Sequence, residues 1–370
     1  MYKEMCMQKI GGFIRKYVPA FTLVSLATAV VCVLIVIISS VSYAAADFFN
    51  STVSTAYRFI TAKLTEIFPF STFEVLMYLV LPLIAFLVFV AVRFCHSETE
   101  RARYAFSLLG VILLIYSAFA VSTSVAYNVT PLGSRLEMQS VEITADNLYD
   151  TAKILLDESN SLAARLEFDE NGSAVMPYSL DELSKKLGDA YASLSEKYSF
   201  VPGYKTRVKP ILTKGAMSSI RLLGIYTFYT GEANINIDYP DANLPFTTAH
   251  EFAHQRGIIR ENEANFVAFL VCLESDDDFI RYSGYLRLYE YVASSLYKTD
   301  VDTYRDLIAG MSDDVRSELI YESEVSKQYA DGWIGKLSNK LNDLYLKANG
   351  TEGVVSYGLV TRLAVAFYSK

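Results

Sequence analysis

The sequence is poor in histidine, tryptophan and cysteine: its 370 residues include three histidines, one tryptophan and four cysteines. The cysteines, Cys6, Cys32, Cys95 and Cys272, lie far apart, so we expect neither a disulfide framework nor a cysteine-rich metal site. Positive charge is also limited, because 41 acidic residues outweigh 33 lysines and arginines and give a net charge of −8. With no basic stripe in the sequence, nucleic acid is not expected as a partner.

Apolar residues make up 52% of the chain, and they are concentrated in its first third. Three uncharged stretches occur there, from Tyr17 to Ala46, from Val75 to Val92 and from Ala105 to about Tyr127. A helix needs roughly 20 residues to cross the hydrocarbon layer. The sequence therefore predicts three transmembrane helices, at about residues 19–46, 75–93 and 105–127. A cleavable signal peptide fits the first stretch poorly, because it is too long and two more follow; a buried soluble helix is the alternative for the second.

The orientation of these helices follows from lysine and arginine, which favour the cytoplasmic side. The basic residues of the two segments expected inside are Lys3, Lys9, Arg15 and Lys16 before the first stretch, and Arg93, Arg101 and Arg103 between the second and third. The longer loop from Asp47 to Glu74 has only Arg58 and Lys63. We therefore expect a cytoplasmic N-terminus, a membrane anchor at residues 1–127, and an extracytoplasmic domain at residues 128–370.

Beyond the anchor, helical patterns run from Leu148 to Leu166 and from Leu180 to Tyr198. The segments 225–229 and 233–238 flank a turn at Thr230-Gly231-Glu232 and predict a β-hairpin, whose edge strand can bind an extended peptide. A last apolar stretch, Val354 to Tyr368, contains Arg362 and is short for a membrane span, so we expect a core helix. The predicted fold class is α+β, mostly helical, with a small antiparallel sheet.

Two of the three histidines, His250 and His254, are four residues apart, and Glu251 follows the first. On a helix this spacing places both imidazoles on one side, where they can bind one metal ion while Glu251 reaches a water bound to it. The alternative is three ordinary helix residues. Charges flank the motif on both sides, and each would cost roughly 2.5 to 3.5 kcal/mol inside a membrane, so the site is not intramembrane. These charges are Asp238, Asp241, Arg256, Arg260, Glu261 and Glu263.

A catalytic zinc usually has three protein ligands and one position open to water. Pro245 and a cap at Thr247 or Thr248 predict the start of the histidine helix, Gly257 its end, and a second helix is expected near Arg260. Two glutamates, Glu261 and Glu263, begin that second helix. Glu261 shares a face with small residues, which lets the helices approach closely, so we predict it as the third ligand, with Asn265 orienting a ligand one turn later. Glu263 is the alternative.

The resulting hypothesis is a hydrolase in which His250, His254 and Glu261 bind Zn²⁺ and Glu251 is the general base for hydrolysis of a peptide or protein substrate. Tyr282 and Tyr285 are candidates to stabilise the oxyanion, as are Tyr226 and Tyr229 from the hairpin. The alternative is a membrane-anchored sensor or scaffold of the envelope, in which a zinc ion is structural or activity has been lost. A structural site would usually be closed by four protein ligands.

The run Glu261-Asn262-Glu263-Ala264-Asn265 resembles the downstream element of gluzincin metallopeptidases, in which the ligand glutamate is followed four residues later by aspartate or asparagine. Together with His250 to Gly257, the hairpin turn, Tyr282 to Tyr285 and the three-span start, it resembles a family of bacterial membrane proteins, the domain-of-unknown-function 3810 family. That resemblance implies a compact zincin domain at the cell membrane and no particular substrate. The chain departs from better known zincins in two ways: six residues separate His254 from Glu261, and Arg260 stands where metzincins have a third histidine. The turn between the two helices must therefore be tight.

Overall fold

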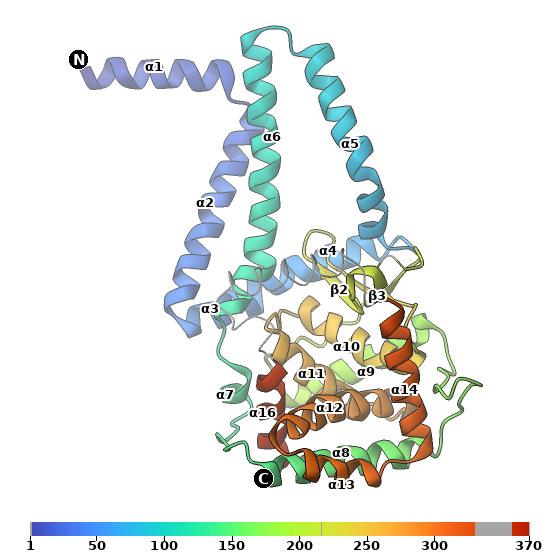
Figure 1. Cartoon of the computed structure of the whole chain (residues 1–370). Coiled ribbons are helices and arrows are strands. Elements are labelled where there is room, and N and C mark those ends of the chain that lie inside the picture. Colours follow the sequence, from blue (N-terminus) through green and yellow to red (C-terminus); the bar gives the residue numbers. More distant parts are fainter. Residues whose placement is uncertain (1, 216, 330–356, 370) are drawn as a thin grey trace. The chain divides into compact units, whose positions relative to one another are not determined.

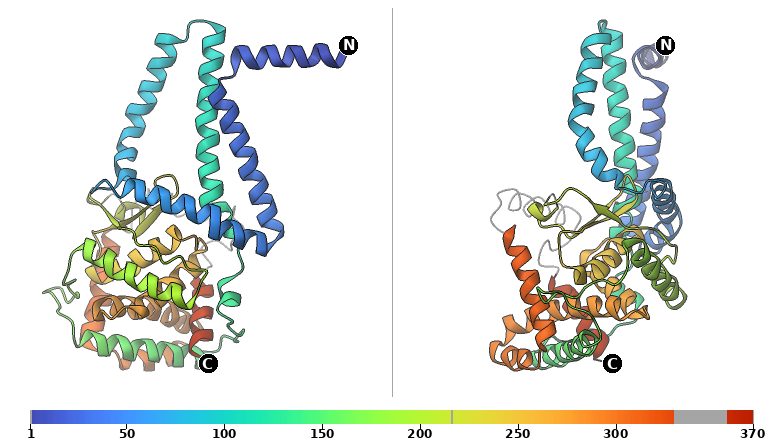
Figure 2. Two further views of the ribbon diagram at one scale, coloured as in Figure 1. Left: turned by 180° about the vertical axis from the view of Figure 1, so that it is seen from behind. Right: turned by 90° about the vertical axis from the view of Figure 1, so that its right-hand side faces the viewer.

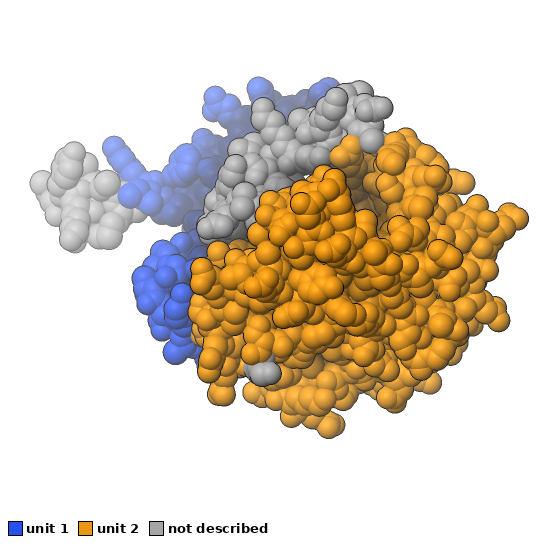
Figure 3. All heavy atoms as spheres, turned by 60° about the horizontal axis from the view of Figure 1, so that its bottom comes forward, with its two compact units in different colours: residues 1–57, 72–129 blue, residues 58–71, 130–370 orange. Residues whose placement is uncertain are grey.

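The computed structural model describes residues 2–215, 217–329 and 357–369, and it is mostly helical with one small sheet (Figure 1). The chain forms two compact units, coloured separately in Figure 3. Unit 1 contains residues 1–57 and 72–129, and unit 2 contains residues 58–71 and 130–370. Residues 58–71 thus pack with the C-terminal part of the chain, although the sequence places them between two apolar stretches.

Unit 1 contains three helices that are long and apolar enough to cross a membrane, as the sequence predicts. They are α2 (Ala20–Val41), α5 (Thr72–Phe94) and α6 (Glu98–Phe119), which continues through two short turns to Asn128. The first ends before residue 46, because Ser42 accepts a hydrogen bond from Ala45 N and starts α3 (Tyr43–Phe49). Helix α1 (Tyr2–Tyr17) precedes α2. Helix α4 (Thr55–Thr65) crosses from unit 1 into unit 2.

Unit 2 is built around one hydrophobic core formed by helices far apart in sequence. Its helices are α7 (Leu132–Arg135), α8 (Ala145–Ala163), α9 (Leu180–Lys197), α10 (Leu244–Gln255), α11 (Glu261–Glu274), α12 (Asp278–Thr299), α13 (Val301–Ala309), α14 (Asp313–Gln328) and α16 (Tyr357–Tyr368). The helices predicted at residues 148–166 and 180–198 are confirmed as α8 and α9. The predicted last helix is α16, with Val360 and Val365 in the core; residues 354–356 lie outside the described residues. Figure 2 gives two further views of these helices.

The sheet of unit 2 has three strands in the order β1-β3-β2. Strands β2 (Gly224–Thr227) and β3 (Glu232–Asn236) are antiparallel and confirm the predicted hairpin. Strand β1 (Lys209–Ile211) is parallel to β3, so the sheet is mixed and the prediction of an antiparallel sheet is wrong. The reason is the connection 212–223, which reverses the chain and places β2 on the far side of β3. Pro210 has no N–H to donate, which suits a strand at the edge of a sheet.

The turn between α10 and α11 is as tight as the sequence requires. Gly257 has φ +85°, a left-handed conformation that glycine adopts without strain. Its N–H donates to the His254 carbonyl at 3.0 Å, and the N–H of Ile258 donates to the Ala253 carbonyl at 3.0 Å. Helix α11 can therefore begin at Glu261.

The start of α10 differs from the prediction, because the helix begins at Leu244 rather than after Thr247 or Thr248. Pro245 lies in its first turn, where the missing N–H of proline costs nothing. Both threonines are buried inside the helix.

Candidate metal centre

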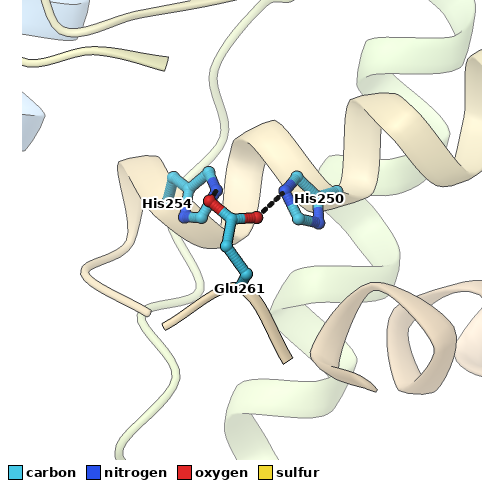
Figure 4. A group of neighbouring side chains, drawn as sticks. All are labelled: His250, His254 and Glu261. Carbon is cyan, nitrogen blue, oxygen red and sulfur yellow. Dashed lines mark ion pairs between the residues drawn. The ribbon is translucent and has the colours of Figure 1, made fainter. Parts of the chain in front are cut away.

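The tight turn brings together three potential metal ligands from α10 and α11, namely His250, His254 and Glu261 (Figure 4). Each offers one ligand atom, and these atoms lie within 4.8 Å of one another. The His250 Nε2 is 3.3 Å from Glu261 Oε2, and the His254 Nε2 is 3.6 Å from Glu261 Oε1. Both imidazoles and the carboxylate thus face a common point.

These distances can be compared with the needs of a zinc ion. Zinc binds nitrogen and carboxylate oxygen at roughly 2.0–2.2 Å in a tetrahedron, which places neighbouring ligand atoms about 3.4 Å apart. The two nitrogen–oxygen distances, 3.3 and 3.6 Å, match that spacing. The third distance, between the ligand nitrogens of the two histidines, is at most 4.8 Å. The donor set of two imidazoles and one carboxylate therefore fits zinc.

A backbone carbonyl holds the Nδ1 of His254, whereas the Nδ1 of His250 has no such partner among the described residues. The Nδ1 of His254 lies 2.9 Å from the Ile258 carbonyl, so Nδ1 carries the proton there and Nε2 is directed at Glu261. The Nδ1 of His250 is buried, and no described residue forms a hydrogen bond with it. Asn265 is buried one turn after Glu261, and its role in orienting a ligand stays a prediction.

The charges of the histidines and of Glu261 shift the pKa values of His254 and Glu261. Burial by itself would lower the pKa of His254, but the Glu261 carboxylate beside it outweighs burial and raises the pKa to about 9. For Glu261, burial acts to raise the pKa, whereas the positive charge of His254 and hydrogen bonds from both histidines lower it well below its ordinary value. In the absence of a metal ion, a proton on His254 therefore neutralises Glu261, and a metal cation would take the place of that proton.

Glu251 lies on the same helix, is only 4% exposed, and contacts the backbone of strand β2. A Cβ on Gly224 would lie 2.5 Å from the Glu251 Oε1 and 2.6 Å from its Cγ, so only glycine permits this approach. Burial raises the pKa of Glu251, and the nearby histidines and a backbone hydrogen bond from Tyr226 oppose the shift. Its Oε2 is buried without a hydrogen bond to any described residue. One oxygen of this buried carboxyl group thus has no hydrogen-bond partner among the described residues.

Glu263, the alternative third ligand, has other partners. Its Oε1 accepts a hydrogen bond from the backbone N–H of Leu132 at 2.9 Å and pairs with Arg260 at 2.9 Å. It therefore ties helix α7 to the start of α11. The structure places Glu261, and not Glu263, beside the two histidines.

The tyrosines proposed for oxyanion binding lie in two different settings. Tyr282 and Tyr285 belong to the core: the ring of Tyr282 packs 6.5 Å from that of Phe168, and the ring of Tyr285 packs 5.7 Å from that of Phe269. Tyr226 belongs to β2, next to Glu251, and Tyr229 is 40% exposed in the hairpin turn. An oxyanion role for any of them stays a prediction; core packing explains Tyr282 and Tyr285 without one.

Several residues that support the site were not identified from the sequence. The hydroxyl of Tyr191 donates to the Ala249 carbonyl at 2.7 Å and thereby fixes α10 just before His250. Arg256 is buried, its guanidinium lies 4.0 Å from the ring centre of Tyr191, and its Nε donates to the Pro202 carbonyl at 3.0 Å. Gly224 is the third such residue, and its position at the start of a predicted strand was the only available signal.

Comparison with known proteins gives a family but no described relative. A family model described as "Protein of unknown function (DUF3810)" matches residues 46–365. No curated protein and no solved structure matches the chain. Because the matched region covers well over half of the chain, including nearly all of unit 2, the chain belongs to the DUF3810 family.

Proposed function

We propose that the protein is a membrane-anchored, zinc-dependent metallopeptidase that hydrolyses peptide bonds on the outer side of the membrane. The observation that carries this proposal is the convergence of His250, His254 and Glu261 within 4.8 Å, with Glu251 buried on the same helix. The motif resembles that of gluzincins, and the geometry of α10 and α11 supports the resemblance. Among the described residues the group has three donors, which suits an open catalytic site better than a closed structural one.

The residues of the site have separate roles in this proposal. A zinc ion, when bound, supplies a Lewis acid that lowers the pKa of a water towards about 7. Glu251 accepts a proton from the attacking water and delivers it to the leaving nitrogen. Its burial suits this task, because a raised pKa brings a carboxyl group closer to neutral pH, where it can both take and return a proton. Glu261 and the two histidines hold the metal ion.

Strand β2 offers a place for the substrate. It is the last strand in the order β1-β3-β2, so one of its edges faces away from β3. Extended peptides commonly bind such an edge by adding a strand. Because Gly224 and Tyr226 of β2 contact Glu251, a peptide on this edge would run past the general base.

The test uses the purified full chain in detergent. The wild type should contain about one zinc per chain and hydrolyse a pool of quenched fluorescent peptides. Glu251→Gln should keep the metal and lose hydrolysis, His254→Ala should lose both, and Glu170→Gln, in an exposed turn, should change neither. Full activity in Glu251→Gln would refute the peptidase. Zinc without hydrolysis of any peptide would favour the alternative, an inactive zinc-binding sensor or scaffold of the envelope.

A further inference from the structure

Helix α4 and the residues after it, 58–71, have two different faces. On the inner face Arg58 and Ala62 are buried, and Thr65 donates from its hydroxyl to the Thr230 carbonyl at 3.0 Å. On the outer face the large apolar side chains are exposed, including Leu64 at 60% and Ile67 at 76%. The exposed set is Phe59, Ile60, Leu64, Ile67, Phe68 and Phe70, called the α4 apolar face below. An exposed apolar face of this kind indicates an interaction surface.

The chain itself indicates what covers this face. Ser71 is followed directly by α5 (Thr72–Phe94), one of the three helices long and apolar enough to cross a membrane. The α4 apolar face is thus joined by a peptide bond to a helix that is long and apolar enough to span a membrane. Amphipathic helices in such positions lie in the interface with their apolar side towards the acyl chains.

The few charges in residues 58–71 indicate that this segment would bind lipid through apolar contact rather than through charge. Residues 58–71 contain three charged side chains: Arg58 is fully buried, and Lys63 pairs with Glu66 at 2.6 Å. The segment therefore presents no net charge to its surroundings. Neutral lipid should be sufficient, and anionic lipid should add little.

The inner face of α4 is connected to the metal-binding helix through one glycine. Gly231 has φ +70°, and a Cβ there would lie 2.4 Å from the Thr61 Oγ1 and 2.5 Å from the Ala62 N. The carbonyl of the same glycine accepts a hydrogen bond from Gln255, the last residue of α10, at 2.7 Å. Gly231 is thus held between α4 and the helix that carries both histidines. Figures 1 and 2 show α4 running alongside the hairpin.

We propose that the α4 apolar face lies in the interfacial layer of the bilayer and, through Gly231 and Gln255, holds the metal centre at a fixed height next to the membrane surface. The ligand of this surface is the lipid bilayer. One consequence rests on the proposed function: the substrate is a peptide segment close to the membrane plane, such as the stretch of an anchored protein that emerges from the bilayer.

Tryptophan quenching in the full chain tests the surface directly. The only tryptophan, Trp333, is replaced by Phe, and one probe is introduced at a time, Leu64→Trp on the α4 apolar face or Tyr297→Trp as a control. Tyr297 is 53% exposed near the end of α12, and its ring packs 5.2 Å from that of Tyr304 in α13. Figure 1 shows α13 at the end of unit 2 opposite to α4. Each protein is reconstituted in nanodiscs of phosphatidylcholine with brominated acyl chains.

The proposal expects at least threefold stronger quenching of Leu64→Trp than of Tyr297→Trp by the brominated lipid, and the opposite order with acrylamide in the water. A second probe, Ile67→Trp, should behave as Leu64→Trp does. Equal quenching of Leu64→Trp and Tyr297→Trp by acrylamide would overturn the proposal, because the face would then be in water. Protection of Leu64→Trp from both quenchers would also overturn it and would indicate cover by protein, such as a second copy.

Hydrolysis gives a separate test of the consequence for the substrate. Nanodisc-bound protein is offered one quenched fluorescent peptide pool in two forms, with and without an N-terminal palmitoyl chain. The wild type should cleave the acylated pool at least tenfold faster, and Leu64→Asp/Ile67→Asp should lose that preference while it still cleaves the soluble pool. If neither pool is cleaved, the proposed function fails and the quenching result stands alone; equal cleavage of both pools by the wild type would refute only the membrane-proximal substrate.

Discussion

At the scale of single residues, a substitution at Gly224 should disturb the proposed general base Glu251 without touching the proposed metal ligands. A methyl group at position 224 would lie 2.5–2.9 Å from three atoms of the Glu251 side chain. Gly224→Ala must therefore displace the carboxyl group, and a displacement of about 1 Å can cost roughly 10²-fold in rate. We expect Gly224→Ala to retain zinc and to lose about that factor in kcat. Both are measured on the purified chain.

The control for this prediction is Gly310→Ala, because an added Cβ there meets nothing closer than the Leu307 carbonyl at 3.5 Å. It should leave both zinc content and kcat unchanged. A Gly224→Ala variant with wild-type kcat would show that the position of Glu251 does not matter.

The two neighbouring glutamates should respond differently to the same change. Glu261→Gln removes a ligand charge, so zinc affinity should fall by at least 100-fold with little change in folding. Glu263→Gln weakens the hydrogen bond from Leu132 and removes the ion pair with Arg260, which should cost about 1–2 kcal/mol of stability and leave zinc bound. Zinc content after dialysis against a chelator and the Tm measure the two effects. If Glu263→Gln loses zinc and Glu261→Gln does not, Glu263 is the ligand and Glu261 is not.

At the scale of elements, helix α14 carries a buried carboxyl group that makes stability depend on pH. Burial raises the pKa of Glu318 to about 7, although the N–H of Ala174 and the hydroxyl of Ser173 donate to it. The unfolded chain loses this proton near pH 4.5, so the stabilising effect is complete below that pH and is lost as the pH rises through 7. The raised pKa of Glu318 corresponds to about 3 kcal/mol of stability between the two limits.

The predicted loss of stability with rising pH can be measured. The Tm of the full chain should fall by several degrees between pH 5 and pH 8, and Glu318→Gln should reduce that fall because an amide does not titrate. Glu324→Gln, an exposed position on the same helix, should follow the wild type. An identical pH dependence in Glu318→Gln would exclude this carboxyl group as the source.

The elements also show what a sequence can and cannot predict. Helices α8, α9 and α11, the presence of α10 and the turn at Gly257 follow from local patterns, because spacing and glycine act within a few residues; the start of α10 at Leu244 was not predicted. The pairing of β1 with β3 and the contact of Gly231 with Thr61 join positions far apart in the chain. No local pattern encodes such contacts. For the site, the spacing predicted His250, His254, Glu251 and Glu261 correctly as neighbours, but the closeness of Gly224 depends on how the sheet packs.

At the scale of the whole molecule, residues 58–71 constrain how the chain crosses the membrane. They share unit 2 with residues 130–370, so both segments must lie on the same side. Helices α5 and α6 lie between them in sequence, and an even number of crossings satisfies this condition. If all three helices cross the membrane, only α2 separates the N-terminus from unit 2, and the two lie on opposite sides. This arrangement is consistent with our expectation that Lys9, Arg15 and Lys16 keep the N-terminus inside.

Labelling with a membrane-impermeant maleimide in intact cells tests this arrangement. Cys95 follows α5 in the short loop before α6, so we expect it inside and unlabelled until the membrane is opened. In a chain whose four cysteines are replaced by serine, Leu212→Cys should react at once, because Leu212 is 64% exposed in unit 2 and we expect unit 2 to lie outside. The Cys95 reaction is measured in a second chain, in which the other three cysteines are replaced by serine and Cys95 is kept. If instead Cys95 is labelled in intact cells and Leu212→Cys is protected, the orientation is the reverse of the one expected. The candidate metal centre would then lie in the cytoplasm, and the protein could not be a peptidase on the outer side of the membrane.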